Sequence, residues 1–229
     1  MAFIAVVVAG APQFTPRQNW IIAGPANAPS PMSFMTKSRW PTHGSAGLDA
    51  NHIPFELDRI RGDQGTLRCH VARNNPVWQD IATGDEVLVV FRSADAYISP
   101  NWYPSKHEFH RQVPTWNYIV AHAHGRVTVH DDERYVRRNV AKLTHKHEGS
   151  QPVPWKMGDA PREFIDTMVK AIVGLEIEIT RLVGKAKLSQ NKELRDIHGA
   201  AEALNSQGEQ KVGQAMLAAA EQKSGRADR

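Results

Sequence analysis

The sequence has a single cysteine, Cys69, among 229 residues. One thiol cannot form a disulfide framework or a thiolate metal site within one chain, and this usage fits a reducing compartment, so we expect a cytoplasmic protein. No apolar run approaches the roughly 20 residues that a membrane-spanning helix needs. The opening apolar run of about eight residues has no basic residues before it, and it is short for a signal peptide.

Motifs of several common enzyme classes are missing as well. The chain contains no GxGxxG or GxxxxGK[ST] stretch, so a Rossmann or P-loop nucleotide site is unsupported. It also lacks HExxH and GxSxG. Of the 11 histidines, His122 and His124 alternate within one predicted strand and would share a face. We interpret them as surface or interface histidines rather than metal ligands, because no carboxylate stands near them in the sequence.

Charge of one sign is only slightly in excess. The formal net charge is +4, with a sequence pI near 9.3, and no long run of Lys or Arg accompanies it. A basic balance of this size favours an anionic partner only weakly. Hydrophobic residues make up 41% of the chain, enough for an ordinary core, and six tryptophans are many for this length.

Strand and helix patterns alternate along most of the chain. Alternating apolar and polar residues between turn signals predict strands over residues 50–58, 66–72, 86–92, 115–130 and 175–189. Start and stop residues predict helices over residues 77–82, 132–145, 162–173, 192–204 and 209–222. Tight turns join most of the strands, which favours a closed antiparallel barrel. The predicted fold class is mainly β with peripheral helices (α+β).

The first 41 residues differ from everything after them. Pro and Ala are abundant there, and the apolar residues follow a period of neither 2 nor 3.6. We therefore predict an irregular segment over residues 1–41. A barrel domain with inserted helices is expected over residues 42–191, and a C-terminal helical extension over residues 192–229.

An unusual group of side chains lies between residues 94 and 126. Aromatic residues stand there beside small polar ones, among them Tyr97, Trp102, Tyr103 and Trp116, with Ser99, Asn101, Thr115 and Asn117. A strand that only fills a core uses Val, Ile or Leu. Flat apolar surface with directed donors and acceptors suits a planar heterocycle. The alternative is a loop whose rings cap one end of the barrel with their polar tips in water, and both interpretations remain open.

Candidate phosphate ligands occur at strand ends. His70 and Arg73 end one predicted strand, and Asn75 follows it. The Arg guanidinium offers a planar fork for phosphate oxygens. Further cations and amides lie at the end of the last strand: Lys185, Lys187, Gln190 and Asn191. Amides of this kind suit the carbonyl and NH edge of a pyrimidine-like ring. Together these weak signals suggest a phosphorylated flavin.

Four stretches resemble the motifs of the PaiB family, in the same order. They are residues 69–76 (CHVARNNP), 96–106 (AYISPNWYPSK), 113–118 (VPTWNY) and 187–191 (KLSQN). The resemblance spans residues 42–204. It implies an FMN-binding split barrel related to pyridoxamine 5′-phosphate oxidases, a homodimer, and a negative transcriptional regulator of protease production and sporulation. The expected FMN-binding residues are His70, Arg73, Asn75, Ser99, Trp102, Tyr103, Thr115, Trp116, Asn117, Tyr118, Lys187, Gln190 and Asn191.

Three features depart from the family pattern. Cys69 stands where the family has a glycine before the His, and Asn101 stands where it has a serine before the Trp. Residues 1–41 do not resemble the family's N-terminus, which supplies a helix and a first strand. Because the similarity begins abruptly at Thr42, we predict a shifted reading frame before it and a barrel that lacks one strand and so leaves an unpaired edge.

Three functional classes compete. The first is an FMN-binding regulator acting as a homodimer, the second a flavin-dependent oxidoreductase on the same barrel, and the third a haem-binding protein. We rank them in that order. We assign no catalytic residue and expect no metal site. DNA as a partner rests on the resemblance, because no helix-turn-helix is legible. We expect a dimer to bury Trp102, Tyr103 and Trp116, and residues 104–113 to form a mobile loop.

Overall fold

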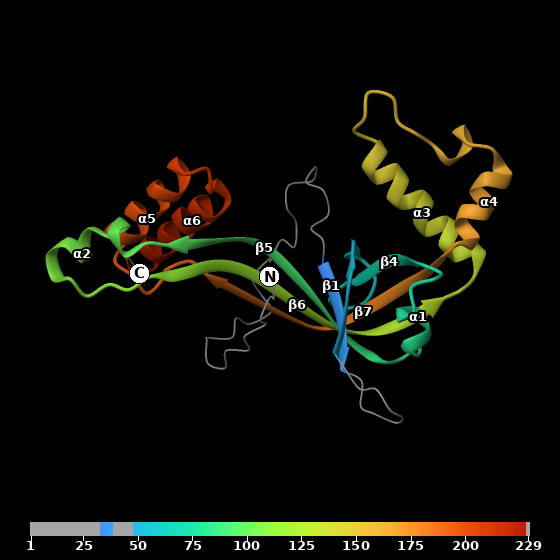
Figure 1. The fold of residues 1–229 in the computed structure, drawn as a ribbon, viewed down its shortest axis with the longest axis horizontal. Coiled ribbons are helices and arrows are strands. Elements are labelled where there is room, and N and C mark those ends of the chain that lie inside the picture. The colour runs from blue at the N-terminus through green and yellow to red at the C-terminus, as the bar shows by residue number, and fades with distance from the viewer. Residues whose placement is uncertain (1–32, 39–47, 228–229) are drawn as a thin grey trace.

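The computed structural model describes residues 33–38 and 48–227, which form a seven-stranded antiparallel sheet with helices at both ends (Figure 1). The strands are β1 (Ser33–Ser38), β2 (Leu48–Ile53), β3 (Glu56–Asp58), β4 (Thr66–Ala72), β5 (Glu86–Ile98), β6 (Thr115–His130) and β7 (Ile172–Lys187). Their order across the sheet is β2-β1-β5-β6-β7-β4-β3. The predicted fold class, mainly β with peripheral helices, is confirmed.

Helices pack at the two ends of this sheet. The described ones are α1 (Val77–Asp80), α2 (Pro104–Phe109), α3 (Glu133–Glu148), α4 (Arg162–Lys170), α5 (Leu194–Ser206) and α6 (Gln210–Ala227), with short 3-10 turns η1 (Pro100–Trp102) and η2 (Met157–Asp159). α3 and α4 stand at one end, and α5 and α6 at the other (Figure 1). None of the described helices is long and apolar enough to cross a membrane.

The two edge strands of the sheet are neighbours in the sequence. β2 and β3 stand at opposite edges, yet only Pro54 and Phe55 separate them. Such a link spans only about 10 Å, so the sheet has to curl until its edges meet. A hydrogen bond from Asn75 Nδ2 to Asn51 Oδ1 (2.9 Å) ties the end of β4 to β2 across this closure. The sheet is therefore a barrel, as the sequence predicts.

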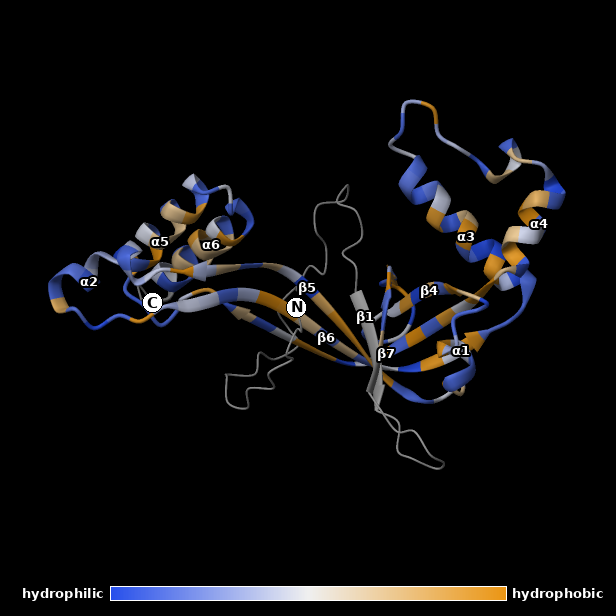
Figure 2. Ribbon diagram, viewed as in Figure 1, coloured by the Kyte–Doolittle hydropathy of each residue, from blue (hydrophilic) through white to orange (hydrophobic). Residues whose placement is uncertain are grey.

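Side chains from most of the strands fill the barrel with one apolar core. Ile53, Leu67, Val89, Ala123 and Leu175, from five different strands, each expose 4% or less of their surface and belong to one cluster. Burying a large apolar side chain contributes about 1.5–3 kcal/mol. Alternate residues supply the core, and the strands accordingly show bands of hydrophobic and hydrophilic colour (Figure 2).

Beyond the barrel, β5, β6 and β7 continue as a three-stranded arm. The pairing of β6 with β7 runs as far as Tyr118 opposite Lys187. One face of the arm packs against α5 and α6 (Figure 1), and a second apolar cluster, which includes Ile98, Ile197 and Met216, lies between them. The other face of the arm has no described helix over it.

The structure contradicts the expectation of irregular structure up to residue 41. Ser33–Ser38 forms β1 between β2 and β5, so the barrel does not lack this strand. Pairing with β2, the next strand, and with β5, about 50 residues further along, holds β1 in place, and local composition does not show such partners. The rest of residues 1–41 lies outside the described residues, and the reading-frame hypothesis stays a prediction.

The strand predicted over residues 50–58 is two strands. Pro54 has no backbone NH to donate to a ladder, and proline is confined to edges and breaks of a sheet. The chain accordingly leaves β2 before Pro54 and enters β3 after Phe55 at the opposite edge. This interruption is what allows the barrel to close.

Gly199 in α5 lets the helix approach η1. A Cβ at this position would lie 2.5 Å from the Trp102 carbonyl oxygen and 3.1 Å from Pro104 Cδ. We predict that Gly199→Ala lowers the free energy of unfolding by about 1–3 kcal/mol, because the backbone has to move. Gly225→Ala in α6 is the matched control, since nothing lies within 4 Å of its Cβ, and it should be neutral or stabilising. Denaturant unfolding followed by circular dichroism compares them, and equal stabilities would contradict the close approach.

Candidate functional site

The open face of the arm carries aromatic and basic side chains. Tyr97 on β5 stands opposite Trp116 on β6, and Tyr118 stands opposite Lys187 on β7. Because side chains alternate along a strand, these residues and Lys185 point to the same face. The Tyr97 and Trp116 rings meet edge to face, with centroids 5.9 Å apart. These five residues are termed the platform.

The platform is open and basic. Tyr97 exposes 46% of its surface and Trp116 exposes 54%. The Lys185 ammonium lies 5.7 Å from the centroid of the Tyr118 ring, within cation–π reach. Lys187 donates a hydrogen bond to Thr115 Oγ1. The platform thus combines flat aromatic surface with two cations, which suits a planar ligand that carries negative charge.

Two of the predicted site residues are buried on the covered face of the arm. Tyr103 and Asn117 are both 0% exposed within the single chain, so the expectation that a dimer buries Tyr103 is wrong. The Tyr103 hydroxyl lies 3.3 Å from Ser189 Oγ, and Asn117 Nδ2 donates to Ser189 Oγ (3.0 Å) and Met216 Sδ (3.2 Å). Burial raises the pKa of the Tyr103 hydroxyl, which stays protonated.

The turn after β7 is fixed by its own side chains. Ser189 has φ 62°, a left-handed conformation that the bonds from Tyr103 and Asn117 hold in place. The Gln190 amide folds back, accepting from the Leu188 NH (2.8 Å) and donating to the Ala186 carbonyl (2.7 Å). Gln190 therefore shapes the turn, while Asn191 is exposed.

The remaining predicted residues near the arm support its backbone. Ser99 Oγ accepts a hydrogen bond from the Asn101 NH (3.2 Å) and so begins η1. Trp102 is half-buried and packs against the second apolar cluster. These residues hold the end of the arm, and the platform lies on its other face.

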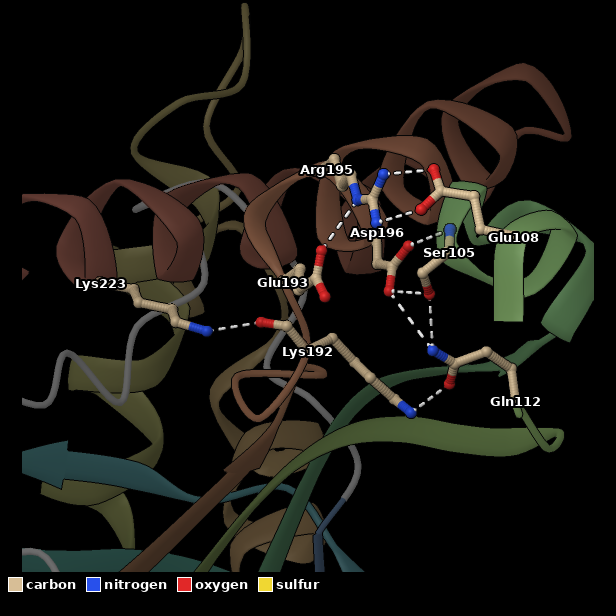
Figure 3. Close-up of polar contacts among 8 residues, drawn as sticks. All are labelled: Ser105, Glu108, Gln112, Lys192, Glu193, Arg195, Asp196 and Lys223. Atoms are coloured by element: carbon tan, nitrogen blue, oxygen red, sulfur yellow. Dashed lines mark hydrogen bonds and ion pairs between the residues drawn. The ribbon is translucent and has the colours of Figure 1, made fainter. Parts of the chain in front are cut away.

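A buried carboxylate on α5 fixes α2 (Figure 3). Asp196 is 1% exposed and accepts hydrogen bonds from the Ser105 NH (3.0 Å) and the Ser105 hydroxyl (2.6 Å). Gln112 Nε2 donates to the same hydroxyl (2.7 Å), and Arg195 Nη2 donates to Glu108 Oε2 (2.8 Å). The predicted loop is therefore wrong for the residues that form α2, which is a helix tied to α5.

The predicted phosphate ligands lie near the other end of β7, and two of them have other partners. Arg73 pairs with Asp131 through both guanidinium ends (2.5 and 3.1 Å) and donates through Nε to the Lys170 carbonyl (2.7 Å). That pairing holds the pKa of Asp131 below its usual range. Asn75 bonds Asn51, as described above, and accepts from the NH of the first residue of α1.

The two groups of predicted residues are far apart within one chain. His70 stands opposite Gly174 on β7, whereas Tyr118 stands opposite Lys187, 13 residues further along the same strand (187 − 174). At about 3.3 Å per residue the separation is roughly 40 Å. The structure therefore brings the aromatic platform together and leaves His70, Arg73 and Asn75 outside it.

Two residues of the platform are absent from the predicted FMN set. Tyr97 joins it because it stands opposite Trp116, and Lys185 joins it because it lies two residues from Lys187 on β7. A face-by-face reading of both strands, with Trp116 as the reference on β6, would have found them. By contrast, no local pattern pointed to Asp196 as the residue that fixes α2.

The paired histidines on β6 lie on the same face as the platform, nearer the barrel. His124 Nε2 lies 2.8 Å from the Arg181 guanidinium. Burial, followed by the charge of Arg181, lowers the pKa of both His122 and His124, so both are neutral at pH 7. Neutral imidazoles beside a guanidinium act there as polar packing groups.

The family comparison shows the class of protein, which is a flavin-binding one. The model of the family described as "Putative FMN-binding domain" matches residues 33–181. The chain belongs to this PaiB-type FMN-binding family. The match begins at Ser33, the first residue of β1, so the expectation that the family resemblance begins at Thr42 is wrong.

Relatives occur in fungi and in a bacterium. An uncharacterised protein of Aspergillus fumigatus is 31% identical over an alignment of 202 residues, and the alignment covers 70% of this chain and 77% of that protein. The Bacillus subtilis "Protease synthase and sporulation protein PAI 2" is 27% identical over 158 residues, which are 69% of this chain and 73% of that protein.

Solved structures show a more distant likeness. The "FAD and Heme binding protein" of Mycobacterium smegmatis aligns with a TM-score of 0.48 and 16% identity over 69% of this chain. The flavocytochrome Anf3 of Azotobacter vinelandii aligns with a TM-score of 0.44 and 9% identity, also over 69%. The chain spans slightly less than two thirds of each of these structures, 65% and 62%.

Removing the Asp196 carboxylate should release α2. We predict that Asp196→Ala lowers the free energy of unfolding by about 1–3 kcal/mol, because the Ser105 NH and hydroxyl lose a buried acceptor. Amides of α2 should also exchange faster with solvent hydrogen. Glu193→Ala is the control, since this exposed carboxylate pairs with Arg195 and surface pairs contribute little. Unchanged exchange in α2 would show that Asp196 does not fix it.

Proposed function

We propose that this chain is an FMN-binding transcriptional regulator of the PaiB type that acts as a homodimer and holds FMN on the platform. The observation that carries the proposal is the exposed Tyr97–Trp116 pair beside two lysines in a chain of an FMN-binding family. Rings exposed to this degree are costly in water and are typical of a surface that a ligand or partner covers.

The platform residues fit the cofactor. The isoalloxazine of FMN is flat and largely apolar, and aromatic side chains such as Trp116 and Tyr118 stack on such rings. Its phosphate is anionic, and Lys185 and Lys187 supply positive charge on the same face. When bound, FMN supplies the ability to accept and return one or two electrons. The chain's own residues bind and orient it.

A second copy of the chain covers the open face of the platform. Trp116 is 54% exposed in the single chain, and large aromatic residues are enriched in the cores of interfaces. Trp102, half-buried by its own chain, lies at the same end of the arm. A dimer that covers this end would shield one face of the flavin from water.

The polar groups of the platform suit binding better than proton transfer. Chemistry on a second substrate needs a positioned acid or base. Asp95 stands opposite Tyr118, but its carboxylate is paired with Arg92. A regulator needs only a ligand that binds its two states differently. DNA as the partner of this regulator rests on the resemblance to the PaiB family, and the net charge of +4 favours an anionic partner only weakly.

The position of the FMN phosphate can be tested with two matched variants. Lys187→Met should weaken FMN binding by about 1.5–3 kcal/mol, roughly tenfold or more, because one charge-assisted bond is lost. Riboflavin affinity should not change, since riboflavin has no phosphate. Arg73→Met removes a cation that Asp131 already neutralises and should leave both affinities unchanged. Flavin-fluorescence titrations measure all four affinities, and loss of FMN selectivity in Arg73→Met alone would move the phosphate to the His70 end.

Regulator and oxidoreductase differ in turnover and in DNA binding. We expect the FMN-loaded protein to be a dimer by light scattering and to show slow or absent flavin reduction by NAD(P)H in stopped flow. Its affinity for a short mixed-sequence duplex should fall steeply as salt rises, because phosphate contacts dominate such binding. Rapid reduction and substrate-coupled reoxidation without DNA binding at about 50 mM salt would establish the oxidoreductase instead.

A further inference from the structure

A cavity of about 260 Å³ lies between α3 and the β3–β4 hairpin, at the opposite end of the molecule from the platform. Tyr135 anchors the start of α3 by donating a hydrogen bond to Glu176 Oε2 (3.2 Å). From there the helix rises away from the sheet (Figure 1). Asn139, Leu143 and His147, each four residues apart, share the helix face that lines the gap. This space is termed the α3 cavity.

On its sheet side the α3 cavity is lined by apolar groups and by an arginine whose charge is already paired with carboxylates. Phe55 and the neighbouring side chains of β4, His70 and Arg68, line it. The Arg68 guanidinium is already engaged, at 2.7 Å from Asp58 Oδ2 and 3.2 Å from Glu176 Oε2. A second anion entering the cavity would have to compete with both carboxylates.

An ion-pair cluster stands at the mouth of the α3 cavity. Glu56 on β3 pairs with Lys146, and its Oε1 lies 3.3 Å from His147 Nε2. The Lys146 and His147 side chains are about half exposed, and exposed pairs of this kind are weak. The mouth can therefore open at little cost, and its carboxylate disfavours anionic ligands.

Two polar groups inside the α3 cavity are suited to a heterocycle. Burial lowers the pKa of His70, so its imidazole is neutral at pH 7 and offers one donor and one acceptor. The structure shows no hydrogen bond from this ring within the described residues. The Asn139 amide makes one long bond, 3.4 Å, from Nδ2 to the Cys69 carbonyl. A lactam or ring NH edge could pair with both groups.

We propose that the α3 cavity binds an uncharged bicyclic heteroaromatic molecule of the purine-base or indole class. An apolar cavity of about 150 Å³ accepts benzene, so two fused rings suit the larger volume found here. The cavity is smaller than the roughly 300–1,000 Å³ of sites for larger ligands, which excludes a whole FMN molecule. Phe55 and Leu143 contact the ring faces, and His70 and Asn139 read its polar edge. The site is independent of the flavin platform.

Calorimetric titration of the FMN-saturated protein with hypoxanthine and with indole tests the proposal. Both should bind once per chain, and hypoxanthine roughly 2- to 12-fold more tightly, because its lactam edge adds a hydrogen bond. Indole-3-carboxylate, the anionic counterpart of indole, should not bind at the same concentrations. Absence of binding by both neutral probes, or tighter binding of the carboxylate, would overturn the proposal.

Two tryptophan variants of α3 locate the binding. Leu143→Trp fills the α3 cavity and should abolish probe binding, whereas Lys142→Trp, on the exposed face of the same helix, should leave it unchanged. FMN affinity should be the same in both variants. A failure of the flavin proposal can therefore be told apart from a failure of the α3 cavity proposal. Probe binding by a folded Leu143→Trp protein, or displacement of the probe by FMN, would refute the α3 cavity as the site.

A second readout does not depend on the folding of that variant. The imidazole proton resonances of His70, assigned with His70→Gln, should shift when hypoxanthine is added to the FMN-saturated wild-type protein. The resonances of exposed His145, on the opposite side of α3, serve as the control and should not move. Resonances of His70 that stay unshifted under saturating probe would count against the proposal.

Discussion

The long antiparallel ladder between β6 and β7 is the interaction on which the rest of the structure depends. It runs from Tyr118 opposite Lys187 to His130 opposite Gly174, so it belongs to both the arm and the barrel. Its single irregularity falls at Gly125, where a Cβ would lie 2.4 Å from the Glu178 carbonyl oxygen. Only glycine fits there, and the bulge lets the two strands twist from an open arm into a closed barrel.

Sequence patterns predicted elements with strong local signals and missed those held by distant partners. The bounds predicted for β4 and β6 are those found, because both strands alternate and end at clear breaks. α2 looked like a charged loop, since its stabilising carboxylate, Asp196, lies 91 residues from Ser105. β1 was not predicted, because its Pro- and Ala-rich segment lacks an alternating pattern and its pairing with β2 and β5 makes it a strand.

The sequence pointed to some residues of the platform, and its binding of FMN stays a prediction. Aromatic density marked the arm, and Trp116 and Tyr118 lie on the platform. Strand alternation puts Asn117, between them, on the covered face, where it became a buried partner of Ser189. Spacing along the chain does not reveal that His70 lies 13 residues along β7 from the platform (187 − 174), and its predicted role toward FMN stays a prediction. The register between paired strands decides which face a residue occupies and how far apart two residues lie, and one strand's sequence does not give it.

The arm has exposed backbone along its sides. Over the part of the chain that the structure describes, β7 beyond Thr180 and β5 beyond Val90 pair with β6 alone. Unpaired strand edges invite pairing with other chains and hence aggregation, and proteins protect them with lysines and bulges. Lys185 and Lys187 lie on the β7 edge, and the irregularity between Arg92 and Asp95 interrupts the β5 edge. The two lysines proposed to face the cofactor phosphate also lie on a strand with an unpaired edge, so we expect that replacing both with apolar residues costs solubility as well as affinity.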